Sequence, residues 1–299
     1  MNDHLPEGMG LRPGGFTMED LRRAKIEDRI LQAAAVICTE EQDLLVDLGC
    51  CMGRIEKNET ASGMQEGTVR PIAVLSRVGK PVSFKVLDIS ANGQVSLSRR
   101  LAQEAAHRQL LSTRHPGDII PAVVTSPAAF GAFCDIGCGV SALMGIEAIS
   151  VSRIEHSRDR FHEDQKIFAA IRSIDYDTGR VQLTHRELLG TWAENAALFR
   201  TGQTVTGIVR SIKDYGAFIE LTPNLSGLAE PNFDLHVGDM VSVYIKSILP
   251  DRQKIKLVAL RKLDPESQPQ KPLRYFRTTG HLDRWQYGPS GNAKTITVF

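Results

Sequence analysis

"SIKDYGAFIEL", residues 211–221, places two aromatic rings around a glycine in a run of apolar and β-branched residues that predicts a strand. Nearly the same string, "SPAAFGAFCDI", lies at residues 126–136. The two strings align ring on ring, Phe130 with Tyr215 and Phe133 with Phe218. A repeat of this kind indicates that one structural unit occurs more than once in the chain.

The likeness extends past these strings and divides the chain into three units. A fainter copy lies near the start, where "EEQDLLVDLGCCMG" matches "PAAFGAFCDIGCGV". The stretches between the units are rich in Ala, Leu and Glu and are predicted to be linking helices. We predict an N-terminal extension at 1–25, units at 26–100, 115–188 and 201–263, linker helices at 101–114 and 189–200, and an aromatic and basic tail at 264–299.

Each unit contains short apolar runs broken by Gly, Pro, Asn and Asp, the pattern of a small β domain. In the third unit Ala217 and Ile219 face inward while Phe218 and Glu220 face outward, because side chains alternate along a strand. The second unit repeats this alternation, with Asp135 facing outward. A length of about 65 to 75 residues with about five strands suits a closed barrel of the OB type. We therefore predict a mainly β fold of three tandem OB-like five-stranded barrels joined by short helices.

The composition is that of a globular protein with no excess of either charge. The 299 residues include 36 Lys and Arg against 35 Asp and Glu, so an anionic partner must be met by local patches. No apolar run reaches the roughly 18 residues of a membrane span, and the first residues do not resemble a secretory signal. Five cysteines, an odd number, favour reduced thiols, and their spacing does not predict a zinc site. We expect a cytoplasmic protein without metal or cofactor and without a membrane partner.

The outward-facing ring in each string needs an explanation. Gly216 allows the strand to bend, so that the rings of Tyr215 and Phe218 can share one outer surface. A nucleobase stacks on such a ring for about 1 to 3 kcal/mol whatever its identity, and a nearby basic residue such as Arg210 can hold phosphate. Packing in the core is the usual fate of a strand aromatic, but repetition at matched outward positions favours binding to single-stranded nucleic acid.

The motifs of the third unit, "VTGIVRSIKDYGAFIEL", "GLAE", "VGDMVSVYIKSI" and "KIKLV", resemble the S1 RNA-binding motif. This OB-fold repeat is named after the largest protein of the bacterial small ribosomal subunit. The resemblance is strong in the second and third units and weak in the first. It implies a surface for single-stranded RNA formed by two aromatics, a histidine, and an Asp and a basic residue around the last turn.

Carried over to this chain, the resemblance implies RNA-binding residues in two units. The complete predicted set is Phe130, Phe133, Asp175 and Arg180 in the second unit, and Tyr215, Phe218 and Lys254 in the third, together with the neighbouring Arg210. The family's histidine position holds Gly145 in the second unit and Glu230 in the third, where Leu249 also replaces the Asp. In the first unit the rings and the base are replaced, by Gln42, Leu45 and Gln94, which predicts a scaffold or docking domain.

Two further segments carry basic residues. The second unit has an insertion at 149–161, where Arg153, Arg158 and Arg160 lie among acidic residues, and a solvated loop is favoured over a phosphate clamp. The tail mixes Trp and Tyr with Arg, and folding back onto the last barrel is favoured over stacking on RNA. Trp192 is expected to anchor the second linker.

These observations predict a non-enzymatic protein that binds single-stranded RNA, including mRNA, with low sequence specificity. The family resemblance implies a role in translation on the small ribosomal subunit. One alternative is a protein-interaction or RNA-regulatory module that acts off the ribosome. Another is a ribonuclease, since such barrels are appended to nucleases, but the sequence has neither a G-x-x-x-x-G-K-[ST] loop nor H-E-x-x-H, and the repeats occupy most of the chain.

Overall fold

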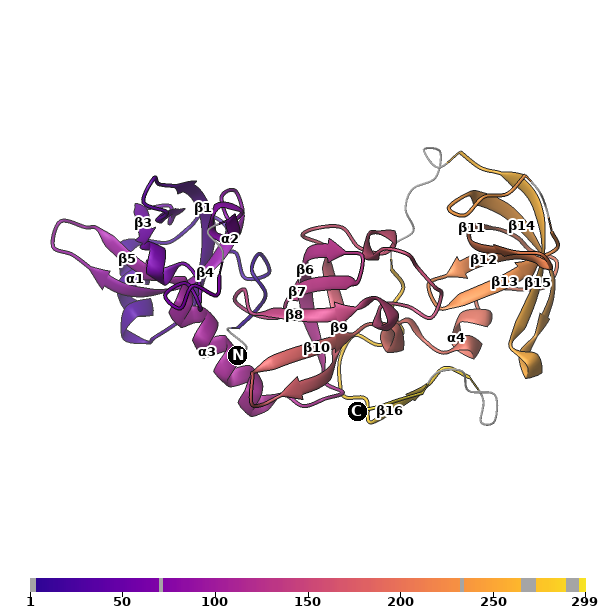
Figure 1. The fold of residues 1–299 in the computed structure, drawn as a ribbon. Coiled ribbons are helices and arrows are strands. Elements are labelled where there is room, and N and C mark those ends of the chain that lie inside the picture. Colours follow the sequence, from indigo (N-terminus) through magenta and orange to yellow (C-terminus); the bar gives the residue numbers. More distant parts are fainter. Residues whose placement is uncertain (1–3, 70–71, 232–233, 265–272, 289–295) are drawn as a thin grey trace.

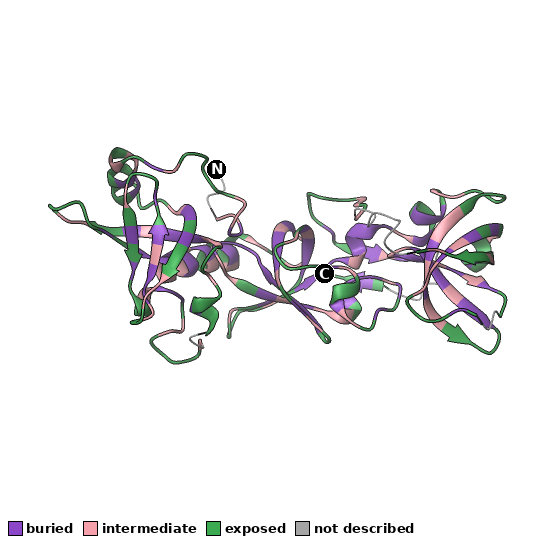
Figure 2. Ribbon diagram, turned by 90° about the horizontal axis from the view of Figure 1, so that it is seen from above, coloured by how far each residue is buried: buried purple, intermediate pink, exposed green. Residues whose placement is uncertain are grey.

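The computed structural model describes residues 4–69, 72–231, 234–264, 273–288 and 296–299. Three closed five-stranded barrels follow one another along an elongated molecule (Figure 1), so the predicted mainly β fold is confirmed. Buried residues recur along the strands and alternate with exposed ones (Figure 2). Each barrel encloses its own apolar core.

The barrels share one topology. In each, the strands are ordered first, second, third, fifth, fourth around the barrel, and the third and fifth strands run parallel. The first barrel contains β1 (Leu31–Cys38), β2 (Leu44–Asp47), β3 (Met52–Ile55), β4 (Pro81–Ile89) and β5 (Val95–Ser98). The middle barrel contains β6 (Ile119–Ala128), β7 (Gly131–Asp135), β8 (Ser141–Gly145), β9 (Lys166–Asp175) and β10 (Arg180–Thr184). The third contains β11 (Thr204–Lys213), β12 (Gly216–Thr222), β13 (Leu225–Ala229), β14 (Met240–Leu249) and β15 (Lys254–Lys262).

Short helices connect and cover the barrels. The α-helices are α1 (Met18–Ile26), α2 (Ile72–Leu75), α3 (Arg99–Thr113) and α4 (Trp192–Ala196), and the 3-10 turns are η1 (Lys57–Glu59), η2 (Ile146–Ala148), η3 (Ser157–Asp159), η4 (Arg186–Leu189) and η5 (Pro250–Arg252). The second linker is less helical than its composition predicts. Gly190 has φ +84°, which no right-handed helix contains, so the helical conformation is interrupted between η4 and α4. Trp192 is buried in the core of the third barrel, which confirms its predicted role as an anchor.

A bulge occurs at the same place in the first hairpin of every barrel. The pairing shifts between Ala35 and Ile37 in β1, between Val124 and Ser126 in β6, and between Val209 and Ser211 in β11. On the second strand these bulges oppose Leu45, Phe133 and Phe218 respectively. The equivalence of the three units therefore extends to the irregularities of their ladders.

The alternation predicted for β7 and β12 is present, with one difference in burial. Cys134 and Ile219 are fully buried in the barrel cores, and Phe133 points outward. Asp135 and Glu220 also leave the barrel interior, but both are buried, because another part of the chain covers each of them.

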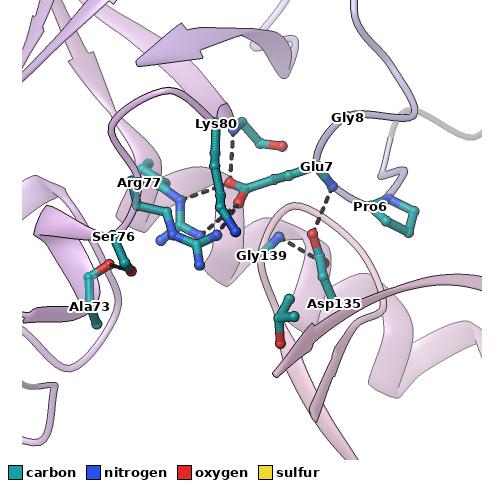
Figure 3. A network of polar contacts seen from close by, with 12 residues as sticks. Pro6, Glu7, Gly8, Ala73, Ser76, Arg77, Lys80, Asp135 and Gly139 are labelled. Carbon is teal, nitrogen blue, oxygen red and sulfur yellow. Dashed lines mark hydrogen bonds and ion pairs between the residues drawn. The ribbon is translucent and has the colours of Figure 1, made fainter. Parts of the chain in front are cut away.

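The first and middle barrels meet through the N-terminal segment. The main-chain N–H of Glu7 donates to Asp135 (2.7 Å), while the carboxylate of Glu7 accepts from Arg99 (2.7 and 2.9 Å) and lies 3.4 Å from Arg77. Figure 3 shows Glu7 between Arg77 on one side and the loop of Asp135 and Gly139 on the other. A segment from outside the repeats thus joins two of them.

The described part of the tail packs against two barrels rather than one. Trp285, in β16 (Arg284–Gln286), and Tyr287 join the core of the third barrel, and β16 pairs with β17 (Ile296–Val298). Tyr275 packs instead on the middle barrel, edge-on to Phe168. The expected folding back onto the last barrel is confirmed for Trp285 and Tyr287, whose burial withdraws them from any role in stacking on RNA, whereas Tyr275 differs from that expectation.

Candidate nucleic-acid interface

The middle barrel exposes its two rings on the outer surface. Phe130 precedes β7 and is 59% exposed, and Phe133 within β7 is 36% exposed. Their centroids are 5.9 Å apart with an interplanar angle of 82°. This edge-to-face contact fixes each ring against the other and leaves both partly open to solvent.

The third barrel repeats the arrangement. Tyr215 is 63% exposed and Phe218 is half-buried, with centroids 6.2 Å apart and an interplanar angle of 86°. Gly131 and Gly216, at the starts of β7 and β12, have φ of +152° and +145°. A Cβ at Gly216 would lie 2.2 Å from the carbonyl oxygen of Ala229, so only glycine lets the backbone close beneath the rings.

A row of side chains continues from each inner ring across the barrel face. The strand partners in the middle barrel run Phe133, Leu143, Gln182 and Ser173. In the third barrel they run Phe218, Leu228, Lys256 and Ser247. Sequence analysis missed Leu143, Leu228 and Lys256, although the two leucines lie at the same offset as the rings. Each barrel therefore offers a half-exposed leucine beside its rings, and the third adds an exposed lysine.

The predicted polar residues of the middle barrel lie at the turn between β9 and β10. The carboxylate of Asp175 accepts from the hydroxyl (2.6 Å) and main-chain N–H (3.2 Å) of Thr178, and these hydrogen bonds lower the pKa of Asp175. Arg180 is the strand partner of Asp175 and is exposed. Tyr176 in the same turn is also exposed and was not predicted. Asp175 thus shapes the turn that presents Arg180.

Lys254 occupies the corresponding turn of the third barrel. It is exposed at the start of β15, opposite Leu249 of β14. Among the described residues neither Lys254 nor Arg180 forms an ion pair within 4.0 Å. The ammonium and guanidinium groups are therefore open to solvent for an anion.

Arg210 is placed differently from the other predicted residues. Its Nε donates to Glu220 (2.9 Å) and its Nη1 lies 3.5 Å from Asp159 of the middle barrel, and the side chain is 11% exposed. The structure brings Arg210 to the junction of two barrels rather than beside the rings. A contact of Arg210 with phosphate stays a prediction, and it would compete with these ion pairs.

The expectation of a solvated loop at 149–161 is wrong for part of this insertion. Arg160 pairs with Glu220, and their side chains are only 4% and 5% exposed. Ile154 and Phe161 are buried in the core of the middle barrel. Arg153 and Arg158 remain exposed. The loop is therefore a packed connector to the third barrel, because buried partners hold it at several points.

The first barrel lacks the ring pair, and the charges on its equivalent row are neutralised. The row runs Leu45, Arg54, Ser96 and Asp88. Arg54 pairs with Asp43, and Asp88 pairs with Lys25 of α1 at 2.7 Å. Its role as a scaffold or docking domain stays a prediction.

The described residues contain no cluster of three His, Cys, Asp or Glu side chains suited to a metal ion. Within the same residues, no helix has the length and apolar character needed to cross a membrane.

Comparison with known proteins assigns the middle barrel. Residues 114–186 match the family model described as the S1 RNA binding domain. A small ribosomal subunit protein bS1 from Leuconostoc lactis is 31% identical over 195 residues, which cover 60% of this chain and 45% of that protein. The bS1 of Staphylococcus aureus strain COL is 30% identical over 196 residues, covering 60% and 50%. The chain spans about half the length of these curated relatives.

Among solved structures, a multidomain protein with nucleic acid binding domains from Streptococcus pneumoniae is similar to this chain, and the matched region covers 78% of this chain and 73% of that one. Its identity is 13% and its TM-score is 0.27. The barrel assignment therefore depends on the strand pairing described above and on the family match. Residues 114–186, which form the middle barrel, match the S1 RNA binding domain, and the chain as a whole is a repeat of three barrels of one topology that is similar to bacterial small ribosomal subunit protein bS1.

Proposed function

We propose that this protein binds single-stranded RNA with low sequence specificity through the ring pairs of its middle and third barrels. The observation that supports this most is the repetition of one exposed edge-to-face pair, Phe130 with Phe133 and Tyr215 with Phe218, at the same place on two barrels. Every base has a face that can stack on such a ring, so the contact tolerates sequence. Exposure of an aromatic ring to water is unfavourable, and a base that stacks on the ring removes part of its surface from water.

Phosphate contacts would come from basic residues around the rings. Arg180 and Lys254 are exposed at equivalent turns, and Lys256 lies in the row that begins with Phe218. Each phosphate contact to single-stranded nucleic acid lowers the slope of log K against log salt by about 0.7. We expect binding to weaken steeply as salt rises, whereas a mainly apolar protein contact would change little.

The cellular role that fits best is mRNA binding in translation, in the cytoplasm and with the small ribosomal subunit as partner. The relatives named above are small ribosomal subunit proteins, and this supports the proposal. Co-sedimentation with ribosomal subunits at low and high salt tests it. A chain that stays in the supernatant at low salt while it binds RNA would favour the role off the ribosome.

We propose no catalytic activity for this chain. The family match is to a binding domain, and the curated relatives named above are ribosomal proteins rather than nucleases. Incubation of labelled RNA with purified protein, with and without magnesium, tests this. Intact RNA is expected in both cases.

The deciding experiment replaces all four rings by alanine and measures affinity for a fluorescent single-stranded RNA. With one base stacked on each pair at about 1 to 3 kcal/mol, the loss of both pairs costs at least about 2 kcal/mol and should weaken binding at least about 30-fold. Tyr244→Ala is the matched control, since Tyr244 is exposed on β14 outside the ring rows. Unchanged affinity of the four-ring variant would refute the proposal.

A further inference from the structure

The insertion of the middle barrel contacts both the hairpin that carries the first ring pair and the third barrel. At one end, the hydroxyl of Ser157 in η3 donates to the carbonyl of Ala128 (2.8 Å). Ala128 is the strand partner of Gly131, and this pair closes the hairpin whose tip carries Phe130. Arg158 follows Ser157 directly and is exposed. One arginine of the insertion is therefore held next to the first ring pair.

At its other end the insertion is fixed to the third barrel. Ser152 donates its main-chain N–H to the carbonyl of Pro223 (3.0 Å), and its hydroxyl lies 2.9 Å from that of Ser226 on β13. Ser226 is two residues from Leu228, which stands beside Phe218 in the ring row. Arg153 follows Ser152 directly and is exposed. A second arginine therefore follows a residue that is fixed to β13 two strand positions from the row of the second ring pair.

Two of the three acidic side chains at this junction, those of Asp159 and Glu220, already have partners. Asp159 accepts from the main-chain N–H groups of Glu155 and His156 and pairs with Arg210. Glu220 is shared by Arg160 and Arg210. Glu155 is the remaining carboxylate of the insertion and is exposed. Four arginines therefore meet three carboxylates at the junction, and the two exposed arginines form no ion pair within 4.0 Å among the described residues.

We propose that Arg153 and Arg158 form a phosphate-binding bridge that carries one RNA strand from the ring surface of the middle barrel to that of the third. This inference rests on the proposed function and adds a site to it. The buried pair of Arg160 with Glu220 fixes the two barrels, so the bridge is organised before RNA binds. An RNA strand that is bound to both barrels would also contact the bridge through its phosphates. An RNA bound to one barrel alone would not make these contacts.

The test compares two lengths of single-stranded RNA. An oligonucleotide of about 6 residues covers one barrel, and one of about 20 residues is long enough for two. The variant R153Q/R158Q removes both bridging charges from exposed positions, so its fold should be retained. The control R200Q/R261Q removes the same charge from two exposed arginines outside the insertion.

The bridge predicts an effect that depends on RNA length. R153Q/R158Q should bind the long RNA about 5- to 10-fold more weakly than the wild type, with a salt slope smaller by about 1.4, the value for two phosphates. Its affinity for the short RNA should stay within about 2-fold, and the control should match the wild type for both lengths.

Two results would overturn the bridge while leaving the ring proposal intact. One is unchanged affinity and salt slope of R153Q/R158Q on the long RNA. The other is an equal loss on the short and the long RNA, which would assign the arginines to a single barrel surface. If the wild type binds neither RNA, the proposed function itself fails, and the bridge fails with it.

Discussion

Asp135 and Glu220 occupy the same position in their barrels, four residues after the glycine that starts β7 and β12, and each is buried at a junction between barrels. Asp135 accepts a hydrogen bond from Glu7 of the N-terminal segment. Glu220 pairs with Arg160 of the middle barrel. Asp47, the equivalent residue in the first barrel by strand pairing, is exposed. In the middle and third barrels, this position on the second strand is thus a point at which the barrel is joined to an earlier part of the chain.

Glu220→Gln should uncouple the third barrel from the middle one. The change leaves the guanidinium groups of Arg160 and Arg210 without the carboxylate that they share, and loss of one partner of a buried pair costs about 3 to 5 kcal/mol. We expect calorimetry to show the third barrel unfolding at a lower temperature. Glu230→Gln is the control, because its pair with Lys246 is exposed at 3.9 Å and should contribute little. A single unshifted transition for Glu220→Gln would contradict this role of the pair.

Glu7→Gln should weaken the attachment of the N-terminal segment to the first barrel and α3, while the main-chain hydrogen bond to Asp135 can still form. The substitution removes the negative charge that Arg99 contacts through two nitrogens, in a site closed to solvent. Hydrogen exchange of residues 4–10 should become at least about 10-fold faster, as for a loss of more than about 1.4 kcal/mol in local stability. Glu27→Gln, at an exposed pair with Arg29, serves as the control and should leave that exchange rate unchanged.

His185 should make the middle barrel sensitive to acid. Burial lowers its pKa to about 4, and the neutral ring donates from Nδ1 to the carbonyl of Ile149 (3.0 Å) while Nε2 accepts from the hydroxyl of Tyr275 (3.0 Å). The ordinary pKa is about 6.5, so between pH 6.5 and 4 the unfolded chain binds the proton that the native one excludes. This contribution to the free energy of unfolding therefore falls as pH falls, by at most about 1.4 kcal/mol for each pH unit.

The measurement is the difference in unfolding free energy between the wild type and His185→Gln, which should shrink as pH falls from about 6.5 to 4. Burial, together with the nearby carboxylate of Glu7, raises the pKa of Asp135 to about 7, which acts in the opposite sense over the same range. Because both proteins retain Asp135, its contribution cancels in the difference. A difference that does not vary with pH would mean that His185 titrates normally.

Gly131→Ala should distort the surface that carries Phe130 and Phe133. The new Cβ would lie 2.2 Å from the carbonyl oxygen of Met144, and alanine disfavours φ +152°, so we expect a cost of about 1 to 3 kcal/mol and weaker RNA binding. Gly145→Ala is a matched control on the facing strand, since Gly145 is the strand partner of Gly131. Its Cβ would lie nearest to the carboxylate of Glu147, the end of an exposed and flexible side chain rather than backbone. Equal stability of the two variants, by chemical denaturation, would show that the close approach is unimportant.

The amino-acid sequence alone determined the three barrels, their order and the outward direction of the rings. These features follow from a repeat and from the period of two along a strand, and both are visible over short stretches such as 211–221. The resemblance to the S1 motif located Asp175, Arg180 and Lys254 at turns, where the structure places them. Leu143 and Leu228 could also have been predicted from the sequence, because they align with each other when the two ring strings are aligned.

The tertiary structure alone decided how the barrels are joined and which charges remain free. Glu7 meets Asp135, and Arg160 meets Glu220, across long separations in the chain that no local period relates. A charged residue in the sequence is expected to be exposed, because water solvates an ion well. An oppositely charged side chain that the fold brings into contact can replace that water. For this reason the side chains of Arg160 and Arg210 are held in ion pairs and are largely shielded from water, while Arg153 and Arg158 of the same junction remain open to solvent.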